Sequence, residues 1–216
     1  MSKVVAFVPL KKNSERLLNK NFLLLENRPL YQHILNTLIN VDDITETYIF
    51  SSCDEFQEGI PPKVRFLKRD ERLDKNETLG EEIYDAFIDQ VEADIYILAH
   101  ATSPFLSSSS VSQALGAVLN KEFDSAFSAV EIKNFAWFNN KPLNYSLNLI
   151  PRTQDLKSVF IETSGFYVFR KEVWTQLRQR IGRKAYCHVV NLKEGLDIDE
   201  AGDFEMAKLL SSINKI

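Results

Sequence analysis

Short apolar runs alternate along the chain with segments in which apolar residues recur at helical spacing. The first run, residues 4–8, is continuous and rich in β-branched residues, which is typical of a strand buried on both faces of a parallel sheet. Pro29 then opens a segment with leucine and isoleucine at helical spacing. Further strands are expected at residues 47–50, 64–67, 95–99, 125–130, 165–169 and 186–190, and further helices at 77–91, 107–119, from 171 and at 200–213. The alternation predicts an α/β fold with a mostly parallel, three-layer sheet.

The alternation breaks between residues 131 and 161. Large apolar side chains are scattered there among asparagine, proline and lysine with no helical period: Phe135, Trp137, Phe138, Tyr145 and Leu149. We interpret this stretch as a β-rich excursion from a single domain of residues 1–216, either a lid or a dimerisation arm. Its aromatic residues are expected to pack rather than to stack on a sugar.

Composition narrows the class of protein. Hydrophobic residues make up 44% and charged residues 26%, close to the average of soluble globular proteins. The net charge of −4 gives no reason to expect nucleic acid or an anionic membrane as partner. The N-terminal apolar run is too short for a signal peptide or a membrane span, so we expect a soluble, cytoplasmic protein. Cys53 and Cys187 lie far apart in sequence, and two free thiols are expected rather than a disulfide.

A basic loop follows the first strand. Four cations, Lys11, Lys12, Arg16 and Lys20, fall within ten residues, with polar side chains at Asn13, Ser14 and Asn21. Lysine and arginine after a buried strand suit a loop that wraps a triphosphate, because they offer charge and hydrogen bonds to phosphate oxygens. The glycines and the G-K-[ST] ending of a Walker A loop are absent. The alternative is a solvated basic turn, and the two interpretations have equal weight on composition alone.

An acidic segment, L-D-I-D-E-A-G-D, occupies residues 196–203. In an extended chain Asp197 and Asp199 point to the same side, and two carboxylates on one side suit a hard cation such as Mg²⁺. Mg²⁺ would neutralise charge in nucleotidyl transfer. For Asp199 and Asp203 the first turn of a helix is a strong alternative, because acidic residues there complement the helix dipole.

Two further segments carry polar side chains at predicted strand ends. Thr102, Ser103 and Pro104 form a turn that faces a ligand or only caps the following helix, and His100 is either a ligand contact or a partly buried histidine. Arg152 is either a clamp for a carboxylate or a surface arginine. Phe166 and Tyr167 begin a strand, so one is expected to face the core and the other a pocket. No Ser-His-Asp, Cys-His or zinc-type arrangement is present in the sequence.

Together these segments resemble the acylneuraminate cytidylyltransferase family, the CMP-sialic acid synthetases, with CMP-Kdo synthetases as cousins. The family's first loop reads P-A-R-S-G-S-K-R-L-P-G-K-N, and this chain matches it at Pro9, Ser14, Arg16, Leu17, Lys20 and Asn21. Downstream, S-S-C-D-E, L-K-R-D-E, H-A-T-S-P-F-L, R-T-Q-D-L, S-G-F-Y-V and L-D-I-D-E-A-G-D-F match family segments in the same order. The resemblance runs from Val4 to about Leu210.

The resemblance implies a Rossmann-like nucleotidyltransferase fold and an enzyme that transfers CMP from CTP to a sialic-acid-like 2-keto sugar acid, with Mg²⁺ as cofactor. Catalytic roles would fall to Arg16, Lys20, Asp197 and Asp199, with the two aspartates binding the metal. CTP would contact Lys11, Lys12, Asn13, Ser14, Arg16, Lys20, Asn21, Ser52, Arg69 and Thr78. The acceptor would contact His100, Thr102, Ser103, Arg152, Gln154, Phe166 and Tyr167. Residues 131–161 would form the dimerisation subdomain of a homodimer.

Four of the departures from the family pattern concern residues near the expected substrates. Lys11 replaces an arginine, Asn13 replaces a glycine, Glu15 replaces a lysine, and His100 replaces a glutamine. Asparagine tolerates the left-handed backbone that a glycine permits. The match to the family is weaker at the residues expected to contact the acceptor than at those expected to contact CTP. A phosphorylated or phosphonate acid is therefore an alternative acceptor. A sugar-1-phosphate nucleotidyltransferase would carry a glycine-rich loop that is absent here, and the paired aspartates argue against a non-catalytic nucleotide-binding protein.

Overall fold

The computed structural model describes residues 2–213 and is built on a seven-stranded sheet in the order β11-β7-β10-β6-β1-β4-β5. Its strands are β1 (Val4–Leu10), β4 (Glu46–Ser51), β5 (Val64–Lys68), β6 (Ile95–Ala99), β7 (Ser125–Ile132), β10 (Val159–Arg170) and β11 (Ala185–Val190). The helices are α1 (Leu30–Ile39), α2 (Gly80–Ile88), α3 (Ser108–Leu119), α4 (Lys171–Leu177) and α5 (Ala201–Ile213). Two short hairpins complete the fold: β2 (Leu24–Leu25) with β3 (Arg28–Pro29), and β8 (Trp137–Phe138) with β9 (Lys141–Pro142).

The sheet is mostly parallel, as predicted. β10 runs antiparallel to its neighbours β6 and β7, while the pairings of β1 with β4 and β6, of β4 with β5 and of β7 with β11 are parallel. The carboxyl ends of β1, β4 and β6 therefore open on one edge. Ligands of open α/β sheets bind at such an edge, beyond the carboxyl ends of the strands.

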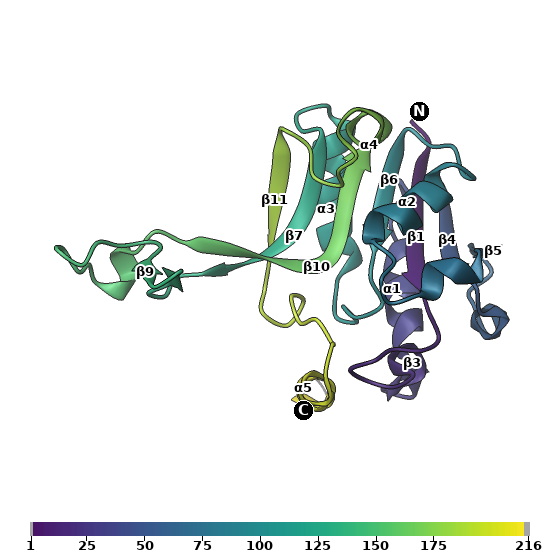
Figure 1. The fold of residues 1–216 in the computed structure, drawn as a ribbon, viewed down its shortest axis with the longest axis horizontal. Helices are drawn as coiled ribbons and strands as arrows, with labels where there is room; N and C mark the ends of the chain where they lie inside the picture. The colour runs from purple at the N-terminus through teal and green to yellow at the C-terminus, as the bar shows by residue number, and fades with distance from the viewer. Residues whose placement is uncertain (1, 214–216) are drawn as a thin grey trace.

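Helices cover both faces of the sheet and produce the predicted three layers (Figure 1). α1 and α3 pack on one face, where Val4, Ala6 and Val8 of β1 point. α2 and α4 pack on the other face, which receives the alternate β1 side chains Val5 and Phe7. Each fully buried aliphatic or aromatic side chain of this kind stabilises the fold by about 1.5–3 kcal/mol. The continuous apolar run of β1 is thus explained by burial on both faces.

The helix expected at residues 77–91 is shorter than predicted. α2 begins at Gly80 because the side chain of Glu82 accepts a hydrogen bond from the backbone N–H of Leu79 at 2.8 Å and so caps its first turn. The segment before it, residues 75–78, remains an irregular loop beside the sheet edge. This loop supplies side chains to the candidate site described below.

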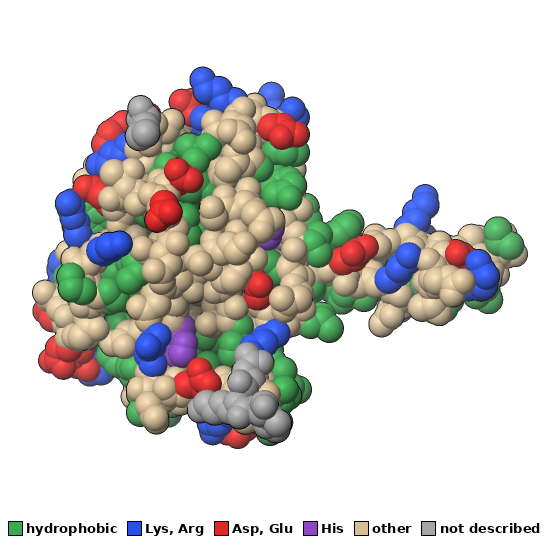
Figure 2. Space-filling model, turned by 180° about the vertical axis from the view of Figure 1, so that it is seen from behind, with side chains coloured by type: hydrophobic (Ala, Val, Ile, Leu, Met, Phe, Trp, Pro, Cys, Tyr) green, Lys and Arg blue, Asp and Glu red, His purple; other side chains and the backbone are tan. Residues whose placement is uncertain are grey.

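Residues 133–158 form an arm that extends away from the body of the molecule (Figure 1). The ladder between β7 and β10, with Val159 opposite Ile132, carries the arm outward. Within it, Tyr145 packs against the rings of Phe135 and Trp137 at centroid distances of 4.9 and 6.3 Å. The excursion predicted at 131–161 is present, but most of its β structure lies in the ladder that leads to it. Figure 2 shows hydrophobic side chains where the arm leaves the body.

Two expectations from composition can be compared with the described residues. Cys53 and Cys187 are both free thiols, as expected. Across residues 2–213, the helices all fall short of the length and apolar character that a bilayer span requires.

Candidate active site at the carboxyl ends of the strands

A cavity of about 300 Å³ opens at the sheet edge where β1 and β6 end. Its walls come from five separate parts of the chain: the loop after β1, the turn after β6, the bulge of β10 at Ser164, the segment after α4, and the acidic segment before α5. The lining side chains include Lys11, Ser14, Lys20, His100, Thr102, Ser164, Arg180, Asp197 and Asp199. Seven of these nine residues belong to the set predicted from the sequence.

The basic loop after β1 is folded back over the sheet edge. Its far end is tied to its start by Asn21, whose side-chain amide donates to the carbonyl oxygen of Lys11 at 2.9 Å. Ser14, a residue of this loop, is buried and lines the cavity. The left-handed residue of the loop is Asn19, with φ of 51°, rather than Asn13, which lies exposed. This hydrogen bond holds the two ends of the loop together, and Lys11 and Lys20 both line the cavity.

An ion cluster connects this loop to the acidic segment. The carboxylate of Asp199 is contacted by Lys20 Nζ at 2.8 Å and by a guanidinium nitrogen of Arg16 at 2.7 Å. Burial raises the pKa of Asp199, but the hydrogen bond and charge of Lys20, helped by Arg16, outweigh burial and hold that pKa below its ordinary value. Asp199 is therefore a stable anion that holds Lys20 in the cavity wall, while Arg16 lines a smaller opening that shares Lys20 and Asp199 with this cavity.

Asp197 and Asp199 face the same cavity, as the D-I-D pattern predicts. Between them Ile198 is fully buried, and its backbone N–H donates to the carbonyl oxygen of Thr102 at 2.9 Å. Asp203 has a separate, structural role, because its carboxylate accepts the backbone N–H groups of Asp199 and Glu200 at 3.0 and 2.8 Å. The helix-start interpretation therefore fits Asp203 and not Asp199, whose carboxylate pairs with Lys20 and Arg16 instead.

One oxygen of Asp197 marks a place for a cation. Asp197 Oδ1 is buried and has no hydrogen-bond partner among the described residues. A buried carboxylate oxygen without a partner is costly unless a positive group completes it. Within residues 2–213, no group of three or more His, Cys, Asp or Glu side chains is placed to hold a metal ion. Mg²⁺ fits such a site, because it is commonly held by one or two carboxylates together with substrate phosphates and water.

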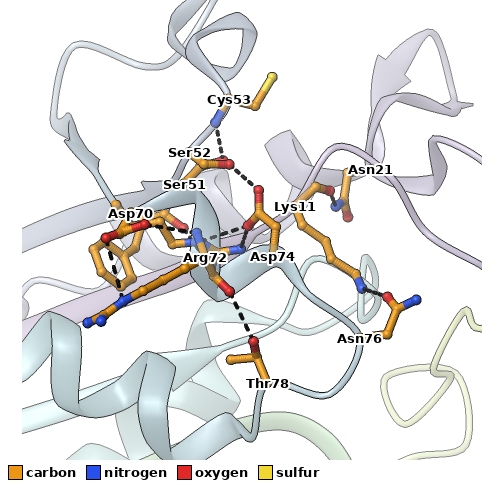
Figure 3. A network of polar contacts seen from close by, with 12 residues as sticks. Lys11, Asn21, Ser51, Ser52, Cys53, Asp70, Arg72, Asp74, Asn76 and Thr78 are labelled. Carbon is orange, nitrogen blue, oxygen red and sulfur yellow. Dashed lines mark hydrogen bonds and ion pairs between the residues drawn. The ribbon is translucent and has the colours of Figure 1, made fainter.

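A second cavity of about 250 Å³ adjoins the first, and Lys11 and His100 line both. Arg69, Asn76 and Thr78 also line it. The amide oxygen of Asn76 accepts from Lys11 Nζ at 3.2 Å, a contact that Figure 3 shows at the rim of this opening. The amide nitrogen of Asn76 donates to the carboxylate of Glu15. Glu15, which replaces a lysine of the family, is therefore hydrogen-bonded to the loop 75–78.

A buried polar network of Arg69, Asp74 and Ser52 lies beside the second cavity. The side chain of Arg69 is only 2% exposed, and its Nη2 contacts Asp74 Oδ1 at 2.5 Å. Ser52 donates to the other carboxylate oxygen of Asp74, as Figure 3 shows. Ser52 and Arg69 were predicted to lie near the cytidine, and the structure places them in one network beside this cavity.

His100 has a defined tautomer because of its neighbour. Its Nδ1 lies 2.5 Å from the carbonyl oxygen of Ser164. A carbonyl oxygen can only accept, so Nδ1 carries the proton and Nε2 has a free lone pair. Burial lowers the pKa of His100, which keeps the imidazole neutral. Ser164 adopts φ of 57° at a bulge of β10; it begins the matched segment S-G-F-Y-V, but it was not among the predicted site residues.

Other predicted residues do not reach the cavities. Lys12 pairs with Glu55, and Ser103 is fully buried. Phe166 and Tyr167 are 0% and 1% exposed and lie in the cores on opposite faces of the sheet, so the expectation that one of them faces a pocket is wrong. The physical reason is that β10 is covered by helices on both faces.

Two predicted acceptor contacts lie on the arm. Arg152 forms an ion pair with Asp155 at 2.7 Å, and Gln154 is exposed in the same short turn. The arm extends away from the sheet and its helices (Figure 1), and none of its residues lines the two cavities. A separate residue, Arg180, lies in the cavity wall although no sequence pattern indicated it.

Comparisons with known proteins agree with this geometry. The family model described as cytidylyltransferase matches residues 5–205. N-acylneuraminate cytidylyltransferase A of Danio rerio is 23% identical over 199 residues, covering 88% of this chain and 46% of the relative. Pseudaminic acid cytidylyltransferase of Campylobacter jejuni is 24% identical over 229 residues, covering 98% of this chain and 97% of the relative. The chain thus spans about half the length of the first relative and nearly all of the second.

The fold has a counterpart among solved structures. The structure of CMP:2-keto-3-deoxy-manno-octonic acid synthetase complexed with CTP superposes with a TM-score of 0.73 at 18% identity, covering 99% of this chain and 100% of the other. This likeness confirms the predicted nucleotidyltransferase fold. The family match over nearly the whole chain shows that this protein belongs to the cytidylyltransferase family and is similar to the acylneuraminate cytidylyltransferases.

Proposed function

We propose that the chain is a CTP-dependent enzyme that transfers CMP to a hydroxyl group of an acidic sugar and releases pyrophosphate. The main support for the proposal is Asp197 Oδ1, a buried oxygen without a hydrogen-bond partner among the described residues. Asp197 lies in one cavity wall with Asp199 and Lys20. A nucleotide-binding protein without chemistry has little use for such a cation site. A cytidylyltransferase needs it beside the triphosphate.

The proposed reaction is an in-line displacement at phosphorus. The acceptor hydroxyl attacks the α-phosphorus of CTP, the bond from that phosphorus to the bridging oxygen of the β-phosphate breaks, and the hydroxyl proton passes to a base. Lys20, which lines the cavity, and Arg16, which pairs with the same carboxylate beside it, stabilise the negative charge that builds on the phosphate oxygens. The cytidine would lie in the adjoining cavity beside Arg69 and Thr78.

A divalent cation is part of this proposal. Members of the family generally depend on a divalent metal ion. Mg²⁺ fits the free oxygen of Asp197, with Asp199, which pairs with Lys20 and Arg16, beside it in the same wall; when bound, the ion would neutralise phosphate charge. What the chain itself contributes is the placement of the two carboxylates, which the buried side chain of Ile198 and its hydrogen bond to Thr102 hold in position.

A sialic-acid-like 2-keto sugar acid is the proposed acceptor, and the product would supply surface-glycan synthesis. The names of two similar proteins state N-acylneuraminate and pseudaminic acid as their substrates. We place the reaction in the cytoplasm, where CTP is present. The alternative acceptor is a phosphorylated or phosphonate acid, which the departures at Glu15 and His100 first suggested.

Pyrophosphate release tests this proposal. Each of the four NTPs is offered with Mg²⁺ against a panel of 2-keto sugar acids and small phosphorylated acids. We expect release with CTP alone among the nucleotides and with a sialic-, legionaminic- or pseudaminic-type acid. Release only with a phosphorylated acid would keep the nucleotide and change the acceptor. A chain that releases no pyrophosphate from CTP with any acceptor is not the proposed enzyme.

A homodimer is the proposed assembly. Large apolar side chains are exposed on the outer part of β10, on the edge strand β11 and just beyond it: Phe160, Ile161, Val189 and Leu192. Exposed apolar patches of this kind mark protein interfaces. In a dimer the arm of one copy would reach the other copy, which would give Arg152 and Gln154 access to an acceptor. Sedimentation equilibrium is expected to give twice the chain mass of 24.9 kDa, and a monomer at all concentrations would contradict the proposal.

A further inference from the structure

A larger cavity of about 660 Å³ lies next to the two already described. It opens between the start of α2 and the segment 178–182 that follows α4, two elements on the same face of the sheet. Gly80 and Tyr84 line both this cavity and the one beside Arg69, while Arg180 lines both this cavity and the one with Asp197. The three cavities therefore share walls, and Arg180 stands where the largest one meets the cation site.

The guanidinium of Arg180 is held in place by aromatic groups. It lies 3.9 Å from the centre of the Tyr167 ring, and Nη1 donates to the hydroxyl of Tyr84 at 3.2 Å. Its neighbour Arg178 differs, because Asp85 neutralises it. Arg180 forms no ion pair of 4.0 Å or less within residues 2–213. A fixed guanidinium with free donors and no counter-ion is a ready site for an anion, since it offers a planar fork of hydrogen bonds.

A carboxylate lies near this guanidinium, and both groups contact Tyr167. Glu162 lines the same cavity, and its carboxylate accepts the hydroxyl of Tyr167 at 2.8 Å. A carboxylate only accepts hydrogen bonds, so it suits hydroxyl or amide N–H groups of a ligand. Trp174 adds apolar surface. The cavity thus combines a cation, an acceptor of hydrogen bonds and an apolar surface, and its volume falls within the range of small-molecule sites.

We propose that Arg180 binds the carboxylate of the acceptor sugar acid and that this cavity holds the rest of the molecule, with Glu162 accepting hydrogen bonds from its hydroxyl or amide groups. The inference rests on the proposed function. In a 2-keto sugar acid the carboxylate is attached to the carbon that bears the attacking hydroxyl. A carboxylate on Arg180, at the border between the two cavities, therefore places that hydroxyl toward Asp197 and the α-phosphate. Arg180 is in this view a residue that sets specificity for acids.

The test compares Arg180→Met with Arg180→Lys and with Arg183→Met. Arg183 is exposed three positions further on and lines none of these cavities, so its substitution removes the same charge as a matched control. We expect Arg180→Met to raise the KM for the sugar acid about 10- to 100-fold, because a charge-assisted hydrogen-bonded pair is lost. The KM for CTP is expected to change less than about 2-fold. Arg180→Lys should restore part of the loss, and Arg183→Met should behave like wild type.

A modified acceptor makes the test specific for the carboxylate. Wild type is expected to prefer the sugar acid over its C1 carboxamide, and Arg180→Met should lose most of that preference. A purely structural role for Arg180 would lower the melting temperature and leave the preference intact. An unchanged preference in Arg180→Met, or wild-type turnover of acid and carboxamide at equal rates, would overturn the inference.

A binding measurement distinguishes a failure of the Arg180 site from a failure of the proposed function. Calorimetric titration of the sugar acid into the protein without CTP measures binding with no need for turnover. Binding that Arg180→Met weakens and Arg183→Met does not would support the site even in a chain that releases no pyrophosphate. Equal binding by wild type and Arg180→Met would reject the role of Arg180 in a chain that is fully active.

Discussion

Asp197→Asn is expected to lower kcat by about three orders of magnitude while the chain stays folded. The substitution keeps the size of the side chain and removes its charge. Asp197 Oδ1 is buried and has no partner among the described residues, so the carboxylate is available to a cation and to little else. An amide is a much weaker ligand for a hard cation than a carboxylate. A 1,000-fold loss corresponds to about 4 kcal/mol of transition-state stabilisation, which one metal-holding charge can supply.

Pyrophosphate release at saturating CTP and acceptor measures this loss, and circular dichroism with a thermal melt confirms that the variant folds. A titration with Mg²⁺ adds an independent readout, because the variant should need a higher concentration for half of its residual activity. Wild-type turnover by Asp197→Asn would reject the metal assignment.

Asp203→Asn is the matched control for this prediction. Asp203 lies in the same acidic segment, but its carboxylate accepts backbone N–H groups of Asp199 and Glu200. Asp203 is the third residue of α5, and an asparagine there keeps an oxygen that can accept the same N–H groups, so the substitution is expected to cost about 1 kcal/mol of stability at most. The kcat of Asp203→Asn is therefore expected to stay within a few-fold of wild type. An equal loss in both variants would indicate a structural effect of the segment rather than lost metal binding.

The strands could be predicted because burial on both faces requires continuous apolar runs, as in β1 and β6. Strand direction could not be predicted. The residues of β10 that cross the sheet read as an ordinary buried run, because the same side chains fill both faces whether the strand runs parallel or antiparallel. Its first residues, 159–162, are largely exposed on the ladder to the arm, so no apolar pattern marked where the strand begins.

The cation side of the candidate site could be predicted because its residues lie in short segments directly at strand ends. Lys20 and Asp199 are separated by 179 positions, yet each follows from local pattern and from the rule that carboxyl ends share one edge. Arg180 could not be found in this way. It sits in an irregular segment after a short helix, and only the packing of Tyr84 and Tyr167 around it gives it a role.

Buried charge explains the second large effect that we expect, a loss of stability in Asp74→Asn. Asp74 accepts hydrogen bonds from Nη2 and Nε of Arg69 at 2.5 and 3.2 Å, and the Arg69 side chain is 2% exposed. Asparagine leaves the guanidinium buried with no counter-ion, and removing one partner of a buried pair costs about 3–5 kcal/mol. Asp74 itself is 32% exposed, so water relieves part of the cost and about 2–4 kcal/mol is expected. Urea unfolding measures the change through the shift in midpoint.

A matched surface pair shows whether burial is the cause. Asp70 contacts Arg72 at 3.5 Å with both side chains well exposed, and such pairs contribute about 0–1 kcal/mol. Asp70→Asn should therefore cost less than about 1 kcal/mol, since asparagine also keeps the cap on the following turn. The double variant Arg69→Met, Asp74→Asn should be more stable than Asp74→Asn alone, because it removes the uncompensated charge. A double variant less stable than Asp74→Asn would show instead that Arg69 stabilises the fold through its contacts with Phe50 and its carbonyl oxygen, independently of Asp74.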